Sequence, residues 1–249
     1  MANKTRVAVI FGGNSVEHEV SVISGLQAFH ALNREKYEPI PLYITKDYNF
    51  YTGETIGDIK CYKDMKTCLA NAIRVLPVKG EQGVDLVRFP FKKFGNNVVA
   101  TFDVALPVVH GTNVEDGTLM GFLEMLSVPY ASCDVTSSAL GMDKAYMKNV
   151  LRDAGVPVLP AREITGQQYA ANGEIIVEEL EKEFGYPVIV KPVNLGSSVG
   201  ISRAVDHDAL ISSLDTAAQF SSRILVERAV PNLREINCSV LGDLHEAKA

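Results

Sequence analysis

The stretch Y-P-V-I-V-K-P-V-N-L-G-S-S-V-G-I-S-R-A-V, Tyr186 to Val205, decides the fold that this sequence predicts. Its apolar start, Pro187 to Val190, predicts a strand that ends on the positive charge of Lys191. The small polar loop Gly196-Ser197-Ser198 follows, and Val199 to Val205 predicts a second strand. The stretch therefore predicts strand, glycine-serine loop and strand, with a lysine at the end of the first strand.

These three parts suit a phosphate-binding cradle. Glycine lets a backbone approach a ligand closely, serine hydroxyls and loop N–H groups donate hydrogen bonds, and lysine adds charge. The pattern is not the Walker A loop G-x-x-x-x-G-K-S/T, because Lys191 precedes the glycine and the loop leads into a strand. A solvated hairpin loop with a chance lysine is an equally weighted alternative, because glycine turns between strands are common.

Composition narrows the class of protein. The chain has 249 residues, enough for one large domain or two ordinary ones, and is 47% hydrophobic and 22% charged, as in soluble globular proteins. It shows no signal peptide and no apolar run of membrane-spanning length. A net charge of −6 without tryptophan argues against a broad nucleic-acid surface, but not against a small anion in a basic cleft. We expect a cytoplasmic protein with no nucleic-acid partner and no membrane partner.

The cysteines give no motif. None of them shows C-x-x-C spacing, and no histidine cluster lies near them; they are Cys61, Cys68, Cys133 and Cys238. This pattern predicts four reduced thiols and no structural zinc site.

The N-terminal part alternates strand and helix. The apolar run Arg6 to Phe11 predicts a buried parallel strand that Gly12-Gly13 ends. Asn14-x-x-Glu17 has the spacing of a capping box, and the helix after it is predicted by apolar spacing at Val22, Leu26, Phe29 and Leu32. Tyr37 to Ile44 predicts the next strand, so half of a βαβ unit is in place.

Polar residues from His110 to Gly117 follow the predicted buried strand Phe102 to Val109. Open α/β sheets bind ligands just past the carboxyl ends of their strands, so this segment is a candidate ligand site. A histidine packed at the strand end and bonded to backbone is the more common alternative for His110. Other elements predicted around this segment are a helix at Tyr62–Ile73, strands at Val84–Phe91 and Val98–Thr101, a helix at Thr118–Leu126 and a short strand at Val128–Tyr130.

A domain boundary is predicted near Val135. Thr136 to Ser138 offer N-caps for a short helix through Met142, and Asp143 caps the next helix, whose predicted buried face is Met147, Val150, Leu151 and Ala154. The remaining predicted elements are a strand at Val158–Ile164, a helix at Gln167–Phe184, a helix at Asp208–Phe220, a strand at Ser222–Glu227, a strand at Arg234–Leu241, a turn at Gly242-Asp243 and a strand starting at Leu244.

Five stretches in order resemble the D-alanine–D-alanine ligases of the ATP-grasp superfamily. They are F-G-G-N-S-V-E-H-E-V-S from Phe11, H-G-T-N-V-E-D-G-T-L from His110, S-A-L-G-M-D-K from Ser138, V-K-P-V-N-L-G-S-S-V-G from Val190 and I-L-V-E-R from Ile224. The resemblance covers nearly the whole chain. It implies an α/β fold: a Rossmann-like pre-ATP-grasp domain at 1–134, followed by an incomplete α+β ATP-grasp domain with its first lobe at 135–230 and the start of its second at 231–249.

The resemblance implies ATP-dependent ligation of two D-alanines to D-alanyl-D-alanine for peptidoglycan, with ATP and Mg²⁺, by a cytoplasmic homodimer. The first D-alanine's carboxylate attacks the γ-phosphate, and the second D-alanine's amine attacks the resulting acyl phosphate. A sister ligase that makes D-alanyl-D-serine or D-alanyl-D-lactate shares all five motifs, and a nucleotide-binding homologue without catalysis is a further alternative. The family's metal-binding acids lie beyond position 249, so no metal ligand is expected within the chain, and these 249 residues alone are expected to be inactive.

The resemblance assigns the first D-alanine to four residues. Glu17 is expected beside its ammonium, where a carboxylate is the natural partner, and Val20 beside its methyl group. Ser197 is expected to couple the glycine-serine loop to Glu17, and His110 to lie by the forming acyl phosphate. For Glu17, the alternative is an acid favoured by the dipole at a helix N-terminus.

The resemblance assigns ATP to a second group of residues. Lys144 and Lys191 are expected to hold its phosphates, as mobile point charges suited to that task, together with Ser197 and Ser198. The hinge that reads adenine is Glu227, Arg228, Ala229 and Val230, and Glu235 is expected on the ribose. The chain departs from the family where Val114 replaces a glycine and Met120 a glutamine; valine takes a positive φ only at a cost.

Overall fold

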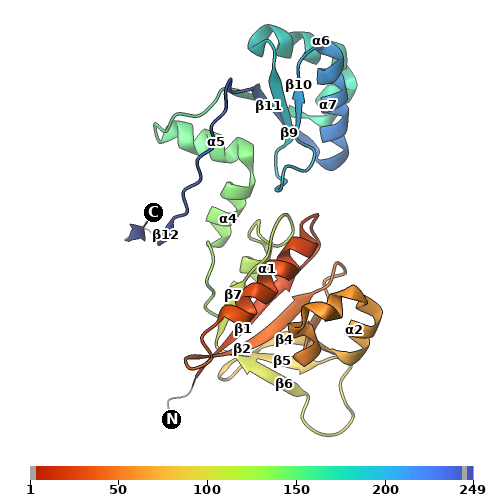
Figure 1. Ribbon diagram of the computed structural model, residues 1–249, viewed down its shortest axis with the longest axis vertical. Coiled ribbons are helices and arrows are strands. Elements are labelled where there is room, and N and C mark those ends of the chain that lie inside the picture. The colour runs from red at the N-terminus through yellow and green to blue at the C-terminus, as the bar shows by residue number, and fades with distance from the viewer. Residues whose placement is uncertain (1–3, 243–245, 249) are drawn as a thin grey trace.

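The computed structural model describes residues 4–242 and 246–248, and Figure 1 shows a larger sheet below and a smaller sheet above. In the larger sheet, β1 (Thr5–Gly12) lies parallel to and between β2 (Tyr37–Ile44) and β7 (Val104–Pro107). Beyond β2 the pairing is antiparallel, through β3 (Phe50–Thr52), β4 (Ile73–Gly80), β5 (Gly83–Arg88) and the edge strand β6 (Val98–Phe102). The parallel β1–β2 pair predicted from the sequence is confirmed.

Strand β1 is buried on both faces, as its continuous apolar run predicts. Val9 and Phe11 pack toward α1 (His18–Ala31) and α2 (Met65–Asn71), while Ala8 and Ile10 pack on the other face with α3 (Thr118–Met125). Two short 3-10 helices, η1 (Glu54–Gly57) and η2 (Ile59–Lys63), precede α2. The helical layers fix α1 tightly against the end of β1, where the candidate site begins.

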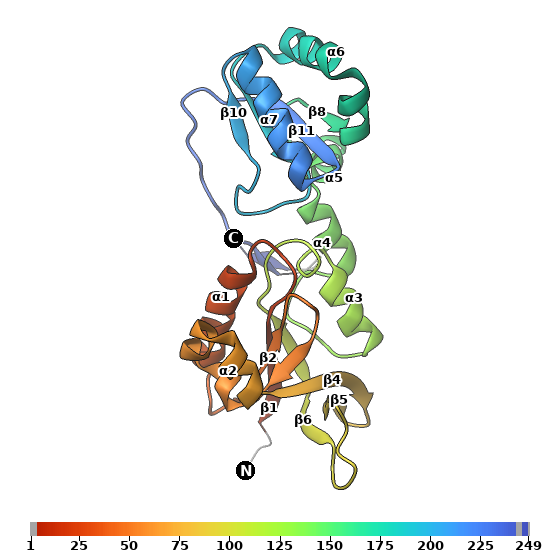
Figure 2. The ribbon, with the colours of Figure 1, turned by 90° about the vertical axis from the view of Figure 1, so that its right-hand side faces the viewer.

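The smaller sheet is antiparallel, in the order β10 (Ser202–Ala204), β9 (Val188–Pro192), β11 (Arg223–Arg228) and β8 (Ala161–Thr165). One face packs on α6 (Gly166–Phe184) and α7 (His207–Phe220), which Figure 2 shows against the strands. The connection from the larger sheet runs through α4 (Val135–Met142) and α5 (Lys144–Asp153). Because side chains alternate along a strand, the second face of β9 and β11 is turned away from α6 and α7 and towards α5.

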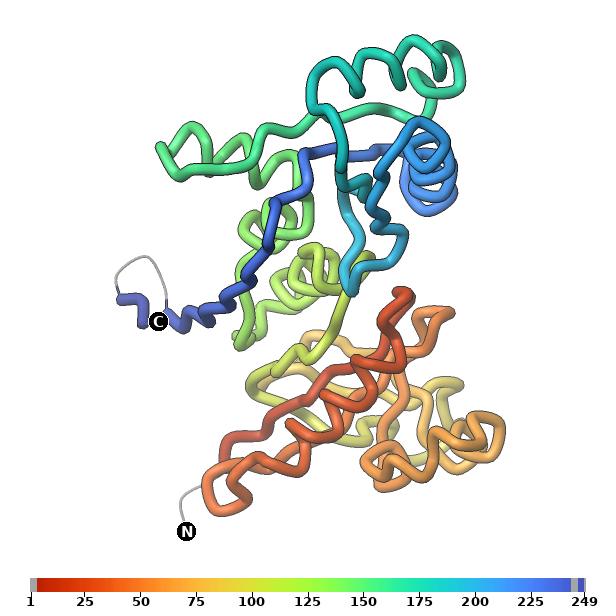
Figure 3. The backbone as a smooth tube through the Cα atoms, turned by 45° about the horizontal axis from the view of Figure 1, so that its top comes forward, coloured from red at the N-terminus to blue at the C-terminus, as the bar shows by residue number. Residues whose placement is uncertain are grey.

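The C-terminal segment corrects one prediction. Residues 229–240 run as an extended, mostly exposed segment from β11 towards β12 (Leu241–Gly242), which pairs with β13 (Ala247–Lys248), as Figure 3 shows in blue. The strand predicted over Arg234–Leu241 is therefore wrong except for Leu241, because no neighbouring strand pairs with the alternating residues that precede it in the described chain. The predicted turn residue Asp243 and the strand start Leu244 lie outside the described residues.

Several helix starts differ from the prediction. The capping box at Asn14 and Glu17 is wrong: Glu17 itself is the N-cap of α1 and no side chain caps that end. Asp134, rather than Thr136 to Ser138, caps α4 by accepting a hydrogen bond from Ser137 N at 2.7 Å. The cap of α5 by Asp143 is confirmed. Aspartate is a better cap here than the hydroxyl residues that follow it, because its negative charge also interacts favourably with the positive end of the helix dipole.

Other elements are shorter than predicted or lie elsewhere. The helix expected over Tyr62–Ile73 begins only at Met65, and the strand expected over Val199–Val205 is confined to Ser202–Ala204, because the loop before it is a turn. The buried face predicted for α5 is wrong at Val150 and Ala154, which are exposed; Ala145 is the buried residue of this helix. The helix docks by its first turn rather than along its length.

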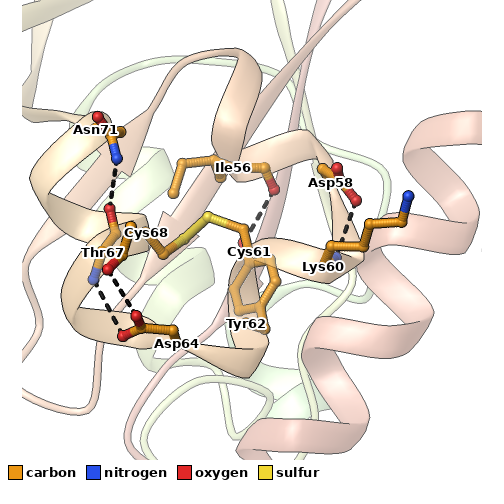
Figure 4. Close-up of a disulfide and its surroundings, with 9 residues drawn as sticks. All are labelled: Ile56, Asp58, Lys60, Cys61, Tyr62, Asp64, Thr67, Cys68 and Asn71. Atoms are coloured by element: carbon orange, nitrogen blue, oxygen red, sulfur yellow. Dashed lines mark hydrogen bonds between the residues drawn. A yellow bond between two sulfur atoms is a disulfide. The ribbon is translucent and has the colours of Figure 1, made fainter.

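The structure corrects the prediction of four reduced thiols. Cys61 and Cys68 form a disulfide with their Cα atoms 5.0 Å apart (Figure 4). Cys133 and Cys238 are free and exposed. Between the two bonded cysteines, Asp64 accepts a hydrogen bond from Thr67 N at 3.2 Å and starts α2, which folds the chain back on η2. The seven-residue separation of these cysteines matches no known motif, so the sequence does not predict the disulfide. The bond forms because α2 folds back on η2.

Candidate functional site

The turn from β1 to α1 places Glu17 at the carboxyl end of the buried strand. Gly12 and Gly13 both have φ of +94°, and a Cβ at Gly12 would lie 2.2 Å from the carbonyl oxygen of Ile44. Glycine is therefore required here by both backbone conformation and space. The chain then enters α1 at His18, so the Glu17 carboxylate is held at the start of a helix that is packed on β1.

The loop between β9 and β10 reaches this carboxylate from the other sheet. Ser197 Oγ donates a hydrogen bond to Glu17 Oε1 across 180 residues of sequence, and Figures 1 and 2 show the loop descending towards the start of α1. Ser197 and Ser198 take left-handed φ values of 47° and 59°. Gly196 lies so close that an added Cβ would be 2.5 Å from Glu17 Oε2. Strain at two consecutive serines is a marker of a functional loop.

His110 and Val20 surround the same end of α1. His110 Nε2 lies 2.8 Å from Ser24 Oγ, so its side chain bonds to a hydroxyl rather than to backbone. Its carbonyl accepts a hydrogen bond from Ser15 Oγ at 2.6 Å, and Ser15 Oγ accepts one from Glu17 N at 3.1 Å. Val20 lies one turn along α1 and is half exposed. Both residues thus lie within the neighbourhood of Glu17.

The H-G-T-N-V-E-D-G turn forms without strain at its valine. Asn113 and Gly117 take the left-handed conformations, with φ of 66° and 94°, and Val114 is buried in the core beside Gly13. Gly111 N donates to Glu115 Oε2 at 2.8 Å, which closes the turn. Met120 is buried in the same core. The two departures from the family pattern therefore fill the core.

Lys144 opens α5 and reaches back to the segment between β9 and the loop. Its Nζ donates to the Leu195 carbonyl and lies 3.4 Å from the Val193 carbonyl. Burial lowers the pKa of Lys144 from its ordinary 10.5, and the neighbouring positive charge of Lys191 lowers it further. Two ammonium groups thus lie close together at the root of the glycine-serine loop.

Glu227 lies between two lysines on the face of β9 and β11 that is turned away from α6. Its Oε1 pairs with Lys191 Nζ, and its Oε2 is 2.8 Å from Lys148 Nζ. Burial raises the pKa of Glu227, but the ammonium groups of Lys148 and Lys191 outweigh it, so the net pKa lies below 4.5. This pairing stabilises the fold above about pH 4.5, and the contribution is lost as the pH falls through the lowered pKa.

Sequence reasoning missed Lys148. The available signal was its position four residues after Lys144 on the same helix, which places both side chains on one face of α5. Lys148 also donates to the Leu159 carbonyl at 3.1 Å, so it is anchored away from the loop.

Of the four predicted hinge residues, Glu227 forms the ion pairs with Lys148 and Lys191, and the other three follow it along the chain. Arg228 is exposed and Val230 half exposed, while Ala229 N donates to the Pro187 carbonyl at 3.0 Å. Glu235 is exposed in the extended segment and has no hydrogen bond or ion pair to any residue between 4 and 242 or between 246 and 248. The structure therefore brings together Glu17, Ser197 and His110 at the tip of the glycine-serine loop, and Lys144, Lys191 and Glu227 at its root. It does not bring Glu235 to either group.

Asp143 joins α5 to the smaller sheet. Its Oδ1 accepts from Ala145 N at 3.0 Å and from Tyr146 N at 2.9 Å, and its Oδ2 pairs with Arg223 Nη1. Arg223 also pairs with Glu163, and its guanidinium lies 4.5 Å from the centre of the Tyr146 ring. One aspartate thus serves as helix cap and as anchor for β11.

We expect Asp143→Ala to reduce the free energy of unfolding by about 2–4 kcal/mol, because it removes a helix cap and a charged hydrogen bond together. Urea denaturation followed by circular dichroism measures the loss. Asp134→Ala is the matched control, since Asp134 caps α4 through Ser137 N and pairs with no arginine within residues 4–242 and 246–248. A loss for Asp143→Ala no larger than that of the control would show that the Arg223 pair contributes nothing.

Two cavities lie close to the predicted site residues, but none of those residues lines either cavity. One of about 530 Å³ lies where α4 meets α5 and is lined by Asp143, Tyr146 and Asn194 among others. Another of about 540 Å³ lies between α1, β2 and α2, around Tyr43 and Tyr62. Neither is lined by a predicted site residue, so we infer the site from side-chain contacts. Within 4–242 and 246–248, no cluster of three metal-ligating side chains could hold a metal ion, and no helix is long and apolar enough to cross a membrane.

Both parts of the chain match known families. Residues 6–133 match the family described as D-ala D-ala ligase N-terminus, and residues 150–249 match D-ala D-ala ligase C-terminus. The chain belongs to the D-alanine–D-alanine ligase family. The D-alanine–D-alanine ligase of Caldicellulosiruptor bescii is 40% identical over 243 residues, which cover 96% of this chain and 64% of the relative. That of Geobacillus kaustophilus is 37% identical over 241 residues, with the same coverage.

Solved ligase structures share the fold. The VanG D-Ala:D-Ser ligase of Enterococcus faecalis has a TM-score of 0.73 and 31% identity, over 92% of this chain and 64% of its own. The D-alanine–D-alanine ligase of Coxiella burnetii has a TM-score of 0.77 and 26% identity, over 92% of this chain and 62% of its own. This member of the D-alanine–D-alanine ligase family spans less than two thirds of the length of these curated relatives.

Proposed function

We propose that the full-length protein carrying this chain joins two D-alanines into D-alanyl-D-alanine with ATP, for peptidoglycan precursor synthesis in the cytoplasm. The observation that carries the proposal is the hydrogen bond from Ser197 to Glu17. It joins a carboxylate on the larger sheet to a glycine-serine loop on the smaller one, which unites an amino-acid site with a phosphate site. We assign residues 1–134 to the substrate domain, 135–230 to the first ATP-grasp lobe and 231–249 to the start of the second.

On the amino-acid side, we assign the ammonium of the first D-alanine to Glu17. Glu17 Oε2 lies beside Gly111 and Gly196, where a side chain on either residue would collide with it. The two glycines therefore leave room at this carboxylate for a small ammonium group. Val20 presents an apolar surface to the methyl group, and Ser197 holds the loop over the substrate. We place the forming acyl phosphate near His110, whose imidazole is oriented by Ser24.

On the nucleotide side, we assign the phosphates to Lys144, Lys191, Ser197 and Ser198. Two ammonium groups at the root of a loop with successive left-handed residues suit an anion, because backbone N–H groups of such a loop converge. We assign adenine to Glu227–Val230 and ribose to Glu235, which requires the extended segment to move. The family uses Mg²⁺, but residues 4–242 and 246–248 offer no cluster to hold it, so no step is assigned through a metal here.

The proposed reaction has two steps. The carboxylate of the first D-alanine attacks the γ-phosphate of ATP, which releases ADP and gives an acyl phosphate. The amine of the second D-alanine then attacks the acyl carbon and expels phosphate, and the amine proton leaves to solvent or a nearby base. The chain's own residues position and neutralise charge: Glu17 orients the first substrate, and the two lysines hold the phosphates in line.

In the free protein, burial and Lys191 lower the pKa of Lys144 below 10.5. A bound phosphate raises that pKa again, so nucleotide binding is expected to take up protons at alkaline pH below 10.5. Binding must then protonate Lys144, so the affinity falls as the pH rises through this window. Isothermal titration calorimetry in two buffers of different protonation enthalpy measures the uptake. A Lys144→Met variant should lose it; the same uptake in that variant would assign the proton elsewhere.

A sister activity, D-alanyl-D-serine synthesis, is the second candidate, favoured by the similarity to the VanG D-Ala:D-Ser ligase at 31% identity. Phosphate release by the full-length protein with ATP and D-alanine as sole amino acid separates the candidates. Release with D-alanine alone supports the D-alanyl-D-alanine reaction, and release that requires D-serine supports the sister reaction. No release with either would leave a nucleotide-binding protein without catalysis.

A further inference from the structure

The loop between β5 and β6 presents aromatic and basic side chains at an outer end of the molecule. It reads F-P-F-K-K-F-G-N-N from Phe89 to Asn97, so three of the chain's ten phenylalanines and two lysines occur without any acidic residue. Figures 1 and 2 show this yellow loop projecting from the larger sheet, at the end away from α6 and α7. None of its residues takes part in the site assigned above.

The phenylalanines of this loop, which we call the aromatic loop (89–97), are unusually exposed. Phe91 is 63% exposed and Phe94 82%. Phe89 packs edge-on against Phe91 with ring centres 5.9 Å apart, and Arg74 lies over Phe89 at 4.9 Å. Exposed apolar side chains that gather at one place mark interaction surfaces, whereas single ones do not.

The aromatic loop is shaped by its own hydrogen bonds. Asn97 Oδ1 accepts from Lys92 N at 2.7 Å, Asn97 Nδ2 donates to the Lys92 carbonyl at 3.3 Å, and Asn96 Oδ1 accepts from Val98 N at 2.9 Å. The side chains of Asn96 and Asn97 thus fix the backbone of a defined turn, from which the rings of Phe91 and Phe94 project. The exposure of the phenylalanines is a property of an ordered turn.

The charge of the aromatic loop is opposite to that of the whole protein. The chain carries a net charge of −6, yet Lys92 and Lys93 stand between the exposed rings with no carboxylate in the loop. Lys93 Nζ lies 5.7 Å from the centre of the Phe94 ring, so its charge lies beside the apolar tip. A projecting tip with aromatic rings flanked by lysines matches a lipid interface, where rings enter the headgroup boundary and ammonium groups meet anionic headgroups.

We propose that the aromatic loop docks the protein reversibly on an anionic lipid surface, with Phe91 and Phe94 entering the headgroup region and Lys92 and Lys93 pairing with lipid phosphates. The proposal departs from the expectation of no membrane partner, which rested on the lack of a membrane-spanning run and did not weigh the surface of a loop. Its position at the end away from the candidate site leaves that site open to solvent while the loop is docked. A lysine near an anionic membrane contributes about 1 kcal/mol to binding, which raises the membrane–water partition coefficient roughly fivefold. Two lysines and two rings therefore give weak binding that salt reduces.

Co-sedimentation of the full-length protein with vesicles tests the proposal. We expect binding to phosphatidylcholine vesicles that contain about a third phosphatidylglycerol, loss of binding in high salt, and weak binding to pure phosphatidylcholine. Lys92→Gln/Lys93→Gln should weaken the binding about 25-fold, and Phe91→Ser/Phe94→Ser should weaken it at least tenfold. The controls are Lys66→Gln/Lys182→Gln, two exposed lysines elsewhere, and Met125→Ser, an equally exposed apolar residue on α3.

Tryptophan fluorescence gives a second readout: residues 1–249 contain no tryptophan, so the difference in emission between a Phe94→Trp variant and the unmodified full-length protein reports on position 94. The emission of a Phe94→Trp variant should shift to the blue with anionic vesicles and stay unchanged with neutral ones. Equal binding to both vesicle types, or full binding by the loop variants, overturns the proposal. A change in oligomeric mass of the loop variants without any change in vesicle binding also overturns it, and would make the aromatic loop a contact between copies of the chain.

Discussion

Replacing Glu17 with glutamine in the full-length protein is expected to lower D-alanine-dependent turnover at least about tenfold. Glutamine keeps the size of the side chain and can still accept the hydrogen bond from Ser197, but it removes the charge that would pair with the substrate ammonium. A charge-assisted hydrogen bond is worth about 1.5–3 kcal/mol, which is about ten- to a hundredfold in rate or affinity. Steady-state phosphate release at varied D-alanine measures the effect.

Glu19→Gln is the matched control for Glu17. Glu19 lies two residues along the same helix and is an exposed acid paired with Lys46 at 2.8 Å on the protein surface. The same loss of charge there should leave turnover near normal. If Glu17→Gln also turns over normally, Glu17 serves the start of α1 and not the substrate. Equal losses in both variants would indicate a general effect of helix charge.

The second large effect is expected for Lys191→Ala, which should weaken ATP binding about ten- to a hundredfold while leaving D-alanine binding nearly unchanged. Lys191 ends β9 at the root of the glycine-serine loop, where a phosphate contact is assigned. Removing it also takes one of two ammonium groups from the buried carboxylate of Glu227. Titration with nucleotide measures the affinity, and thermal unfolding measures the accompanying loss of stability.

Lys148→Ala separates these two consequences. Lys148 and Lys191 are similarly buried, with side chains 12% and 16% exposed, and each pairs with Glu227. Either substitution should therefore destabilise the fold to a similar extent. Only Lys191→Ala should weaken ATP binding strongly, because Lys148 is anchored to the Leu159 carbonyl. Equal effects on ATP would place the phosphates nearer α5, and no effect of Lys191→Ala would remove Lys191 from the site.

The parts of the fold that could be predicted from sequence are those with a local pattern. Tyr37 to Ile44 was predicted as a strand with the bounds that β2 has, and the apolar residues of its second half are the ones that the sheet buries. Asp143 was predicted as a cap, because an aspartate before a helical pattern satisfies the free N–H groups itself. Lys191 and Ser197 were singled out by the strand–loop–strand pattern and Glu17 by the family resemblance, and the contact of Ser197 with Glu17 that the resemblance implied is present.

What could not be predicted depends on how elements dock. Lys148 meets Glu227 only because the first turn of α5 packs on β11, and nothing local in either segment specifies that contact. Cys61 and Cys68 meet only because η2 and α2 fold back on each other. Arg234 to Leu241 has the alternation of a strand, but a strand needs a neighbour to satisfy its N–H and C=O groups, and the extended segment has none over most of its length in the described chain.

The central claim is that the amino-acid site at Glu17 and the phosphate site at Lys191 form one ATP-dependent ligase site for D-alanine. Product analysis of the full-length protein tests this claim most directly. The protein is incubated with ATP, Mg²⁺ and D-alanine, and ADP and dipeptide are quantified by mass spectrometry. One D-alanyl-D-alanine per ADP, with both products reduced together in Glu17→Gln, is the predicted result. ADP formation without any dipeptide, or no D-alanine-dependent ADP formation at all, would contradict the claim.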